Sequence, residues 1–304
     1  MPAGRPQGGE DRSDARTAPE LTNPRAERVR SVRALSGRSV RLRHGRFRVE
    51  GPQAVREAVL GHPADVVVRD VYVTPEAARR HPDVLAAARR VGLPVRLGTP
   101  EVLEAMSPDA QGLVAVADLL AASLDDVVAA GPRLVAVLAH VRDPGNAGTV
   151  IRAADAAGAD AVVVTSASVD VHNPKVVRAT AGSLFHVPVV QGAGLADVVG
   201  ALRAAGLTVL ATDGAGEWDL DDLLDAAGPG GGRHAGTPDL AAPTAWVLGN
   251  EAWGLPDDDR ALADAVVRVP VHGRAESLNL ATAAAVCLYA SARAQRRGGR
   301  RTRA

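Results

Sequence analysis

Short apolar runs alternate with segments of helical pattern from Leu134 to about Ala292, and this alternation constrains the fold more than any other feature. A strand–helix–strand unit of about 30 residues is expected to pair its strands in parallel, with a right-handed crossover. The strand candidates are 135–138, 161–164, 187–190, 207–211, 245–248 and 265–269. The helix candidates are 146–157, 174–181, 195–204, 256–263 and 281–292. The pattern therefore predicts an α/β domain built on parallel strands.

A smaller α/β domain is expected over residues 23–118. Its strand candidates are 47–51, 66–73, 94–97 and 113–116, and its helix candidates are 24–42, 52–60, 77–91 and 100–106. Residues 1–22 are expected to be a polar disordered tail, and residues 119–133 a partly helical linker. The second domain is expected over residues 134–295, with a flexible Gly- and Pro-rich insertion at 228–243, and a basic tail follows at 296–304.

The composition of the 304 residues suits a chain with sizeable cores in a reducing compartment. Apolar residues make up 46% and aromatic residues 2%, so Val, Leu and Ala must fill the interior. No run of about 18 apolar residues is free of charge, and residues 1–20 lack the apolar segment of a secretory signal. The single cysteine, Cys287, lies in an apolar helix candidate and is expected to serve packing. We therefore expect a cytoplasmic protein that does not enter a membrane.

Positive charge is concentrated near both ends of the chain, although the formal net charge is zero. Residues 25–48 contain nine arginines against one acid, and residues 293–303 contain six arginines and no acid. Arginine suits bidentate contact with phosphate, which favours nucleic-acid binding. Because an arginine-rich composition also follows from a GC-rich genome, both interpretations stay open. Between these ends, Lys175 and Arg178 share a face of a capped helix candidate, and a solvated face is the favoured interpretation there.

The first strand-to-helix junction of the second domain, 141–154, carries two polar side chains that suggest a site. Asn146 is expected to be the N-cap of the following helix. Arg152 lies off the apolar stripe of that helix, so its guanidinium is expected to face a cleft or water. The alternative is an ion pair with Asp155, three residues later, which stabilises a helix by only a few tenths of a kcal/mol.

A later junction places a glycine, an acid and an aromatic residue after a strand candidate. Gly249 directly follows 245–248, where the missing side chain lets a ligand approach the backbone. Glu251 lies in the same loop, and pairing with the dipole of the next helix is its alternative role. Trp253 is expected to be a packed lid rather than a platform for a stacked base.

The last junction runs from the strand end Val269-Pro270, through a Gly-containing loop, to Ser277-Leu278-Asn279. Ser277 is expected to be the N-cap of the final helix, with Asn279 on its first turn. Free backbone N–H groups between a strand end and a helix start suit a small polar ligand. A plain capped helix is the alternative.

Together these junctions resemble the three sequence motifs of the SpoU, or TrmH, family of RNA ribose 2′-O-methyltransferases, within the SPOUT superfamily. The matching residues, in the family's order, are Asn146, Gly148 and Arg152, then Gly249, Glu251 and Gly254, then Val269-Pro270 and Ser277-Leu278-Asn279. The resemblance covers about residues 134–293. A looser match relates Phe47–Gly51 and Ser107–Gly112 to the family's amino-terminal substrate-binding domain, which has a ribosomal-protein-like fold.

The resemblance implies a fold and a cofactor that the residue pattern alone does not show. The second domain should be a parallel sheet with helices on both sides, tied into a deep trefoil knot, and the protein should be a homodimer. S-adenosylmethionine should bind in the knot, in contact with Gly249, Val269 and Leu278. No Gly-x-Gly-x-x-Gly sequence follows a strand candidate, so a dinucleotide-type cofactor loop is not expected.

The resemblance also implies catalytic roles. It makes Arg152 the general base, but a guanidinium pKa above about 12 makes proton removal difficult. Holding the 2′-oxygen or the adjacent phosphate is the alternative role of Arg152. Asn146, Glu251, Ser277 and Asn279 would then position Arg152 and the ribose. No metal is expected, because no His, Cys and Asp cluster has the spacing of metal ligands.

The expected reaction is therefore methyl transfer to a ribose 2′-hydroxyl in structured RNA. We favour 23S ribosomal RNA as the partner over transfer RNA, because the family's transfer-RNA enzymes often lack the amino-terminal domain. A second alternative is a non-catalytic RNA-binding factor in ribosome assembly or resistance, and a third is methylation of a base. Intact Arg152, Glu251 and Asn279 argue against the non-catalytic alternative.

Overall fold

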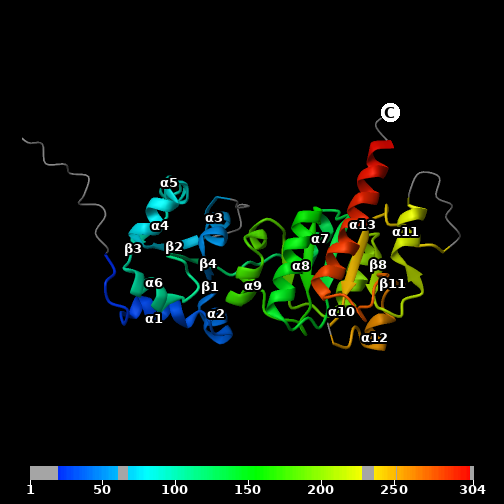
Figure 1. The fold of residues 1–304 in the computed structure, drawn as a ribbon, viewed down its shortest axis with the longest axis horizontal. Helices are drawn as coiled ribbons and strands as arrows, with labels where there is room; N and C mark the ends of the chain where they lie inside the picture. The colour runs from blue at the N-terminus through cyan, green and yellow to red at the C-terminus, as the bar shows by residue number, and fades with distance from the viewer. Residues whose placement is uncertain (1–19, 61–67, 228–235, 251, 302–304) are drawn as a thin grey trace, which may run out of the picture.

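Two β-sheets with their own sets of helices lie side by side along the long axis of the molecule (Figure 1). This computed structural model describes residues 20–60, 68–227, 236–250 and 252–301, with side chains up to Arg297. The first sheet lies within residues 46–118 and the second within residues 134–268. The expected tail over 1–22 and insertion over 228–243 lie largely outside the described residues.

The amino-terminal part holds a four-stranded sheet in the order β1-β4-β2-β3. β4 runs antiparallel to both β1 and β2, and β3 is parallel to β2. The strands are β1 (Arg46–Glu50), β2 (Val68–Val73), β3 (Val95–Leu97) and β4 (Leu113–Asp118). The helices are α1 (Glu27–Ala34), α2 (Arg38–His44), α3 (Pro52–Leu60), α4 (Pro75–Arg80), α5 (Pro82–Arg90) and α6 (Pro100–Met106).

Two of the helices expected in this part are each broken in two. The segment expected as one helix over 24–42 forms α1 and α2, because Gly37 has an extended backbone before α2 (φ −85°, ψ 131°). The segment expected over 77–91 forms α4 and α5, which Pro82 separates. Proline lacks a backbone N–H and disfavours helical geometry in the residue before it, here His81 (φ −124°, ψ 57°).

The carboxyl-terminal part is a seven-stranded sheet in the order β7-β6-β5-β10-β8-β11-β9, and every pairing in it is parallel. The strands are β5 (Leu134–Leu138), β6 (Ala161–Val164), β7 (Val189–Gln191), β8 (Thr208–Thr212), β9 (Trp218–Asp219), β10 (Thr244–Leu248) and β11 (Ala265–Arg268). The helices are α7 (Leu124–Ala129), α8 (Pro144–Ala157), α9 (Pro174–Ala179), η2 (Ser183–Phe185), α10 (Leu195–Ala204), α11 (Leu220–Ala226), α12 (Asp257–Arg260) and α13 (Leu280–Arg301).

Helices cover both faces of this sheet. Side chains of a strand point alternately to opposite faces. Leu134 and Leu138 of β5 join a core with α8 and α13, whereas Val135 and Val137 join a second core with α7 and α10. The α/β fold with a parallel sheet flanked by helices is thereby confirmed. Among the described helices, none combines the length and apolar character that crossing a membrane requires.

The two parts share one continuous apolar core. Phe47 of β1 belongs to the same buried cluster as Leu134 and Ile151, and its ring centroid lies 6.4 Å from that of Phe185 and 4.8 Å from that of His172. The contact between the parts is therefore packed, and it holds the amino-terminal part at a fixed place beside the second sheet.

A buried ion pair lies at the same contact. Arg41 of α2 meets Asp170, which follows β6, at 2.5 Å. Burial alone would raise the pKa of Asp170, but hydrogen bonds from His172 and Arg41 outweigh it and lower that pKa below its ordinary value. The charge on Asp170 is thus stabilised, which strengthens the link between the parts.

Candidate functional site

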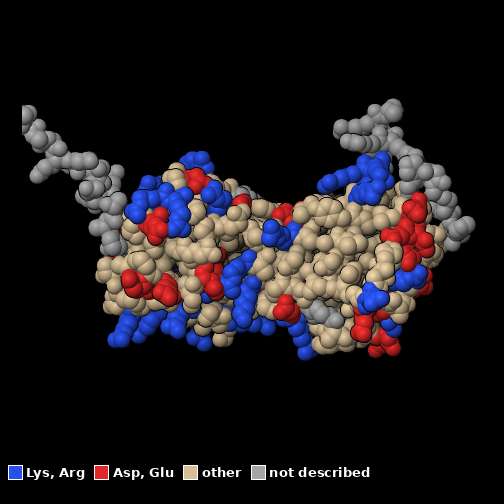
Figure 2. Space-filling view, viewed as in Figure 1, with Lys and Arg blue, Asp and Glu red and all other residues tan. Residues whose placement is uncertain are grey.

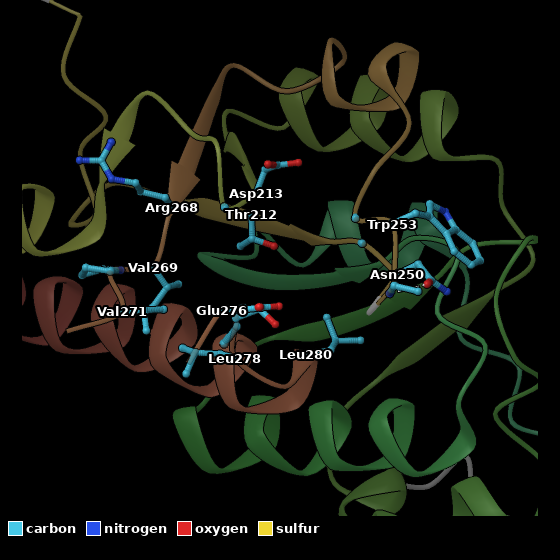
Figure 3. Close-up of a pocket in the computed structure, with 17 residues that line it drawn as sticks. Thr212, Asp213, Asn250, Trp253, Arg268, Val269, Val271, Glu276, Leu278 and Leu280 are labelled. Atoms are coloured by element: carbon cyan, nitrogen blue, oxygen red, sulfur yellow. Dashed lines mark hydrogen bonds between the residues drawn. The ribbon is translucent and has the colours of Figure 1, made fainter. Parts of the chain in front are cut away.

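Three segments far apart in the sequence meet at one cavity of about 730 Å³. They are the loop after β8, the loop after β10 and the segment from β11 to α13 (Figure 3). Residues that line the cavity include Gly249, Val269, Ser277 and Leu278. Strand ends of a parallel sheet meet at one edge, and ligands of open α/β sheets bind there. A volume of this size suits an organic ligand of moderate size.

The loop after β10 folds into a tight turn that places its backbone against the cavity. Asn250 and Gly254 exchange two backbone hydrogen bonds, of 2.8 and 2.9 Å. A Cβ atom on Gly249 would lie 2.6 Å from the carbonyl carbon of Gly254, so only glycine fits there. Glu251, a predicted site residue in this turn, lies outside the described residues.

The loop is also fastened to the loop that follows β5. The side-chain Nδ2 of Asn250 donates to the backbone carbonyl of His140 at 3.0 Å. His140 has a left-handed backbone (φ 60°), which is uncommon for a residue other than glycine. Its Nε2 lies 2.5 Å from a carboxylate oxygen of Asp259 in α12. The β5 and β10 loops therefore form one connected wall.

Asn279, rather than Ser277, caps the final helix. The Oδ1 of Asn279 accepts hydrogen bonds from the backbone N–H of Ala281 (2.9 Å) and of Thr282 (3.3 Å). The prediction that Ser277 is the N-cap was wrong, because α13 begins at Leu280, three residues later. Ser277 instead lines the cavity, in the exposed stretch before the helix.

Asn146 is likewise not the N-cap of α8. Asp143 takes that place, and its Oδ1 accepts from the backbone N–H of Asn146 at 2.7 Å. Pro144 begins the helix one turn earlier than expected. The Nδ2 of Asn279 donates to the Oδ1 of Asn146 at 3.0 Å. The first and third sequence motifs therefore meet directly through these two amides.

Arg152 lies on α8 with an exposed side chain and is not among the residues that line the cavity. The alternative ion pair with Asp155 does not form, because Asp155 accepts from Nδ1 of His186 at 2.9 Å. Within the described ranges, no hydrogen bond or ion pair involves the Arg152 guanidinium. The structure thus leaves Arg152 on an outer face of α8, available to a ligand or to another chain.

Sequence reasoning missed several cavity residues. Thr212 and Asp213 follow β8, Arg268 ends β11, and Glu276 precedes Ser277. Asp213 accepts from Nη1 of Arg260 at 3.1 Å, and Arg268 pairs with Asp219 of β9 at 3.1 Å. Thr212 and Asp213 could have been predicted from the sequence, because polar residues at or just after the end of a parallel strand lie at the edge of the sheet where ligands bind.

Arg178 of α9 is not part of a solvated face. It contacts Glu50 of β1 at 2.7 Å and also pairs with Asp109, whereas Lys175 is exposed as expected. Glu50 is 2% exposed and also accepts from Oγ of Ser107 at 2.6 Å. The two amino-terminal stretches matched in the sequence, around Glu50 and Ser107, therefore lie together, in contact with α9 of the carboxyl-terminal part.

The single cysteine, Cys287, is not among the residues that line the cavity. Cys287 is fully buried in α13, and burial raises the pKa of its thiol to about 12, which fits a packing role. Within the part of the chain that the structure describes, no group of three or more His, Cys, Asp or Glu residues is arranged to hold a metal ion.

Comparison with known proteins gives consistent matches. The model of the SpoU rRNA methylase family matches residues 133–289. The chain is 32% identical over 303 residues to the 23S rRNA (uridine(2479)-2′-O)-methyltransferase of Streptomyces viridochromogenes, covering 94% of this chain and 98% of the relative. It is 32% identical over 273 residues to the 23S rRNA (guanosine(2553)-2′-O)-methyltransferase RlmP of Bacillus subtilis, covering 89% and 98%.

Solved structures resemble most of the chain. An AdoMet-bound rRNA methyltransferase from Sinorhizobium meliloti matches with a TM-score of 0.74 and 30% identity, covering 90% of this chain and 97% of that one. The SpoU methyltransferase AviRb from Streptomyces viridochromogenes, in complex with AdoMet, matches with a TM-score of 0.72 and 32% identity, covering 90% and 100%. The chain therefore belongs to the SpoU rRNA methylase family.

Proposed function

We propose that this protein transfers a methyl group from S-adenosylmethionine to a ribose 2′-hydroxyl in 23S ribosomal RNA. The observation that carries the proposal is the convergence of the loops after β8, β10 and β11 on one cavity in a member of this family. The relatives named above act on 23S rRNA, and two solved neighbours hold AdoMet. Because ribosomal RNA is the proposed substrate, the cytoplasm is the proposed location.

The cavity residues fit the proposed cofactor. Gly249 brings backbone to the cavity surface where a side chain would clash, and Val269 and Leu278 supply apolar surface beside it. We assign the adenosyl group to these three residues. When bound, S-adenosylmethionine supplies a methyl group made electrophilic by its sulfonium. The chain itself must then align the 2′-oxygen with that methyl group and help its proton to leave.

Ser277 lines the cavity, and Asn279 follows the lining residue Leu278, so we infer that the polar groups here orient the ribose. Asn146 and Asn279 fix each other through their 3.0 Å hydrogen bond, and Ser277 lies two residues before Asn279 on the cavity wall. We assign ribose positioning to these three residues and to Glu251. A guanidinium presents a fork of N–H donors and no acceptor, so we assign Arg152 bidentate contact with the phosphate or the 2′-oxygen.

We further propose a homodimer that uses the outer face of α8 and α13. Val286 and Tyr289 lie three residues apart on α13 and are 41% and 52% exposed. Tyr289 donates its hydroxyl to the carbonyl of Ala156 on α8 at 3.3 Å, one turn beyond Arg152. An isologous contact on this face buries both apolar side chains and places Arg152 near a second copy.

Mixed dimers test this arrangement. Arg152→Ala and Ser277→Ala chains are each expected to be inactive alone. If Arg152 serves the cavity of the partner subunit, mixing the two variants should restore about a quarter to a half of the activity. Sedimentation should show a dimer, whereas a monomer at assay concentration would rule the arrangement out.

A deep trefoil knot is the proposed path of the carboxyl-terminal segment. β10 lies between β5 and β8, so the chain returns to the middle of the sheet after its outer strands are in place. α13 then packs back on β10, where Nε1 of Trp246 donates to Oγ of Ser291 at 2.9 Å. If the chain is pulled mechanically from both ends, the tightened knot should make the unfolded chain shorter than its full contour length. An unfolded chain that reaches its full contour length would contradict the knot.

We assign the amino-terminal part, about residues 23–118, to RNA binding. Figure 2 shows a row of basic side chains along the lower edge of this part, over α1 and α2. A cavity of about 750 Å³ lies there, and the arginines that line it are Arg28, Arg30, Arg43 and Arg46. Exposed arginines facing a recess suit phosphate groups of RNA.

A double variant, Arg30→Ala with Arg43→Ala, tests this assignment. It should bind RNA more weakly than wild type, and its affinity should depend less steeply on salt concentration. Unchanged RNA binding would contradict the assignment.

The direct test of the reaction uses labelled S-adenosylmethionine and RNA from cells that lack the protein. Label is expected in 23S rRNA, and digestion followed by mass spectrometry should recover it as a 2′-O-methylnucleoside. Label in transfer RNA, or on a base, would replace the proposed substrate or atom. Absence of both transfer and cofactor binding would favour a non-catalytic RNA-binding factor.

A further inference from the structure

Trp253 is an exposed aromatic residue at the rim of the cofactor cavity. Its side chain is 52% exposed, although it lines the same cavity as Gly249 and Ser277. In Figure 3 it lies at the opposite end of the cavity from Val269 and Val271, and its ring points outward. The expectation that Trp253 is a packed lid was therefore wrong, because a packed lid would bury the indole.

The indole is held in place by a cation and a closed turn. The guanidinium carbon of Arg142 lies 5.2 Å from the ring centroid, over one face of the ring. The turn from Asn250 to Gly254 that carries Trp253 is closed by two backbone hydrogen bonds and tied to His140, two residues before Arg142. The indole and the guanidinium are thus presented together, and about half of the Trp253 surface (52%) remains exposed.

We propose that Trp253 and Arg142 form a stacking platform for an unpaired base of the RNA substrate. This inference rests on the proposed function and names how the same site holds its substrate. A nucleotide that leaves a helix to reach an enzyme site loses its stacking neighbours. Aromatic rings and guanidinium planes replace that stacking in single-stranded RNA recognition.

The position of the platform suits the base rather than the cofactor. Arg142 precedes α8 by two residues, and Asn146 lies in the first turn of that helix. The platform and the proposed ribose-positioning residues are therefore neighbours along one wall. The indole points away from Val269 and Leu278, where we place the adenosyl group. A positive charge on the platform also suits the phosphates beside the base.

The test compares Trp253→Ala with Trp253→Phe, and with Gly200→Ala as a control. Gly200 is an exposed position on α10 where an added Cβ meets no atom within 4 Å, and it does not line the cavity. Stacking on an aromatic side chain contributes about 1–3 kcal/mol per base, which is roughly a 5- to 150-fold change in a binding constant. We expect Trp253→Ala to raise KM for RNA by at least fivefold, Trp253→Phe to retain most of the affinity, and Gly200→Ala to have no effect.

Three further measurements separate the outcomes. Calorimetry should show the same affinity for S-adenosylmethionine in Trp253→Ala and wild type. Weaker cofactor binding with unchanged KM for RNA would overturn the platform, because the ring would then cover the cofactor. An unchanged KM for both RNA and S-adenosylmethionine in Trp253→Ala would also overturn the platform. So would a changed sedimentation coefficient of this variant, because Trp253 would then contribute to subunit assembly. Failure of the wild-type protein to methylate RNA would instead refute the proposed function.

Discussion

At the residue scale, two asparagines connect motifs that lie 133 residues apart. Asn279 uses its Oδ1 to cap α13 and its Nδ2 to hold Asn146, so one side chain serves both helix stability and site geometry. The sequence motifs identified both residues, but the predicted cap of α13, Ser277, lies two residues before Asn279, and the predicted cap of α8, Asn146, lies three residues after Asp143. Helix starts depend on which of several polar side chains first meets a free N–H group, and neighbouring candidates such as Ser277 and Asn279 compete for that role.

Two substitutions of Asn279 separate these roles. Asn279→Asp keeps the capping oxygen but loses the amide donor to Asn146. We expect it to keep the melting temperature while methyl transfer falls at least tenfold. Asn279→Ala loses the cap as well, and is expected to be less stable by about 1 kcal/mol. Thermal denaturation and methyl-transfer assays check both variants; full activity in Asn279→Asp would show that the amide bridge has no part in the reaction.

At the element scale, the parallel strands and most helices follow from the sequence, and the exceptions have physical causes. Apolar runs such as 161–164 are expected in strands buried on both faces. β9 was missed because two residues, Trp218 and Asp219, carry no periodic pattern. The role of Arg178 was missed because its carboxylate partner, Glu50, is 128 residues away in the sequence, and only the packed structure brings them together.

The contact between α9 and β1 is expected to contribute to the stability of the protein. Arg178→Ala removes one cation from Glu50, a carboxylate that is 2% exposed. Loss of a partner from a buried charged group destabilises by about 1–3 kcal/mol. Lys175→Ala, an exposed position on the same helix, is the matched control and should lie within about 0.5 kcal/mol of wild type. Urea denaturation measures both; equal stabilities would show that Glu50 is satisfied without Arg178.

At the scale of the whole molecule, the shared core and the charges around it hold the basic amino-terminal face at a fixed distance from the proposed cofactor cavity. His186, which follows η2, contributes to this link through Glu57 of α3 (3.1 Å) and Asp155 of α8 (2.9 Å). Burial opposes the charged ring, but hydrogen bonds with Asp155 and Glu57 outweigh it and raise the pKa of His186 above 6.5. The link is therefore strongest when His186 is protonated.

The pH dependence of stability checks this link. A raised pKa means that His186 contributes its full stabilisation below about pH 6.5, and that the contribution is lost as pH rises through the folded-state pKa. His186→Gln should remove this contribution. The difference in melting temperature between wild type and variant should therefore shrink as the pH rises from about 6.5 through the folded-state pKa of His186. A difference that stays constant across this range would contradict the assignment.

Binding of S-adenosylmethionine in the cavity formed by three separate loops is the central proposal for this protein. Calorimetric titration of S-adenosylmethionine into Gly249→Ala tests it most directly, because the added Cβ would lie 2.6 Å from the backbone of Gly254 and displace the loop. The control is Gly200→Ala on α10, where an added Cβ meets no atom within 4 Å. We predict saturable binding in wild type and Gly200→Ala, and loss of at least tenfold in affinity in Gly249→Ala. Equal binding in all three proteins, or none in wild type, would contradict the account.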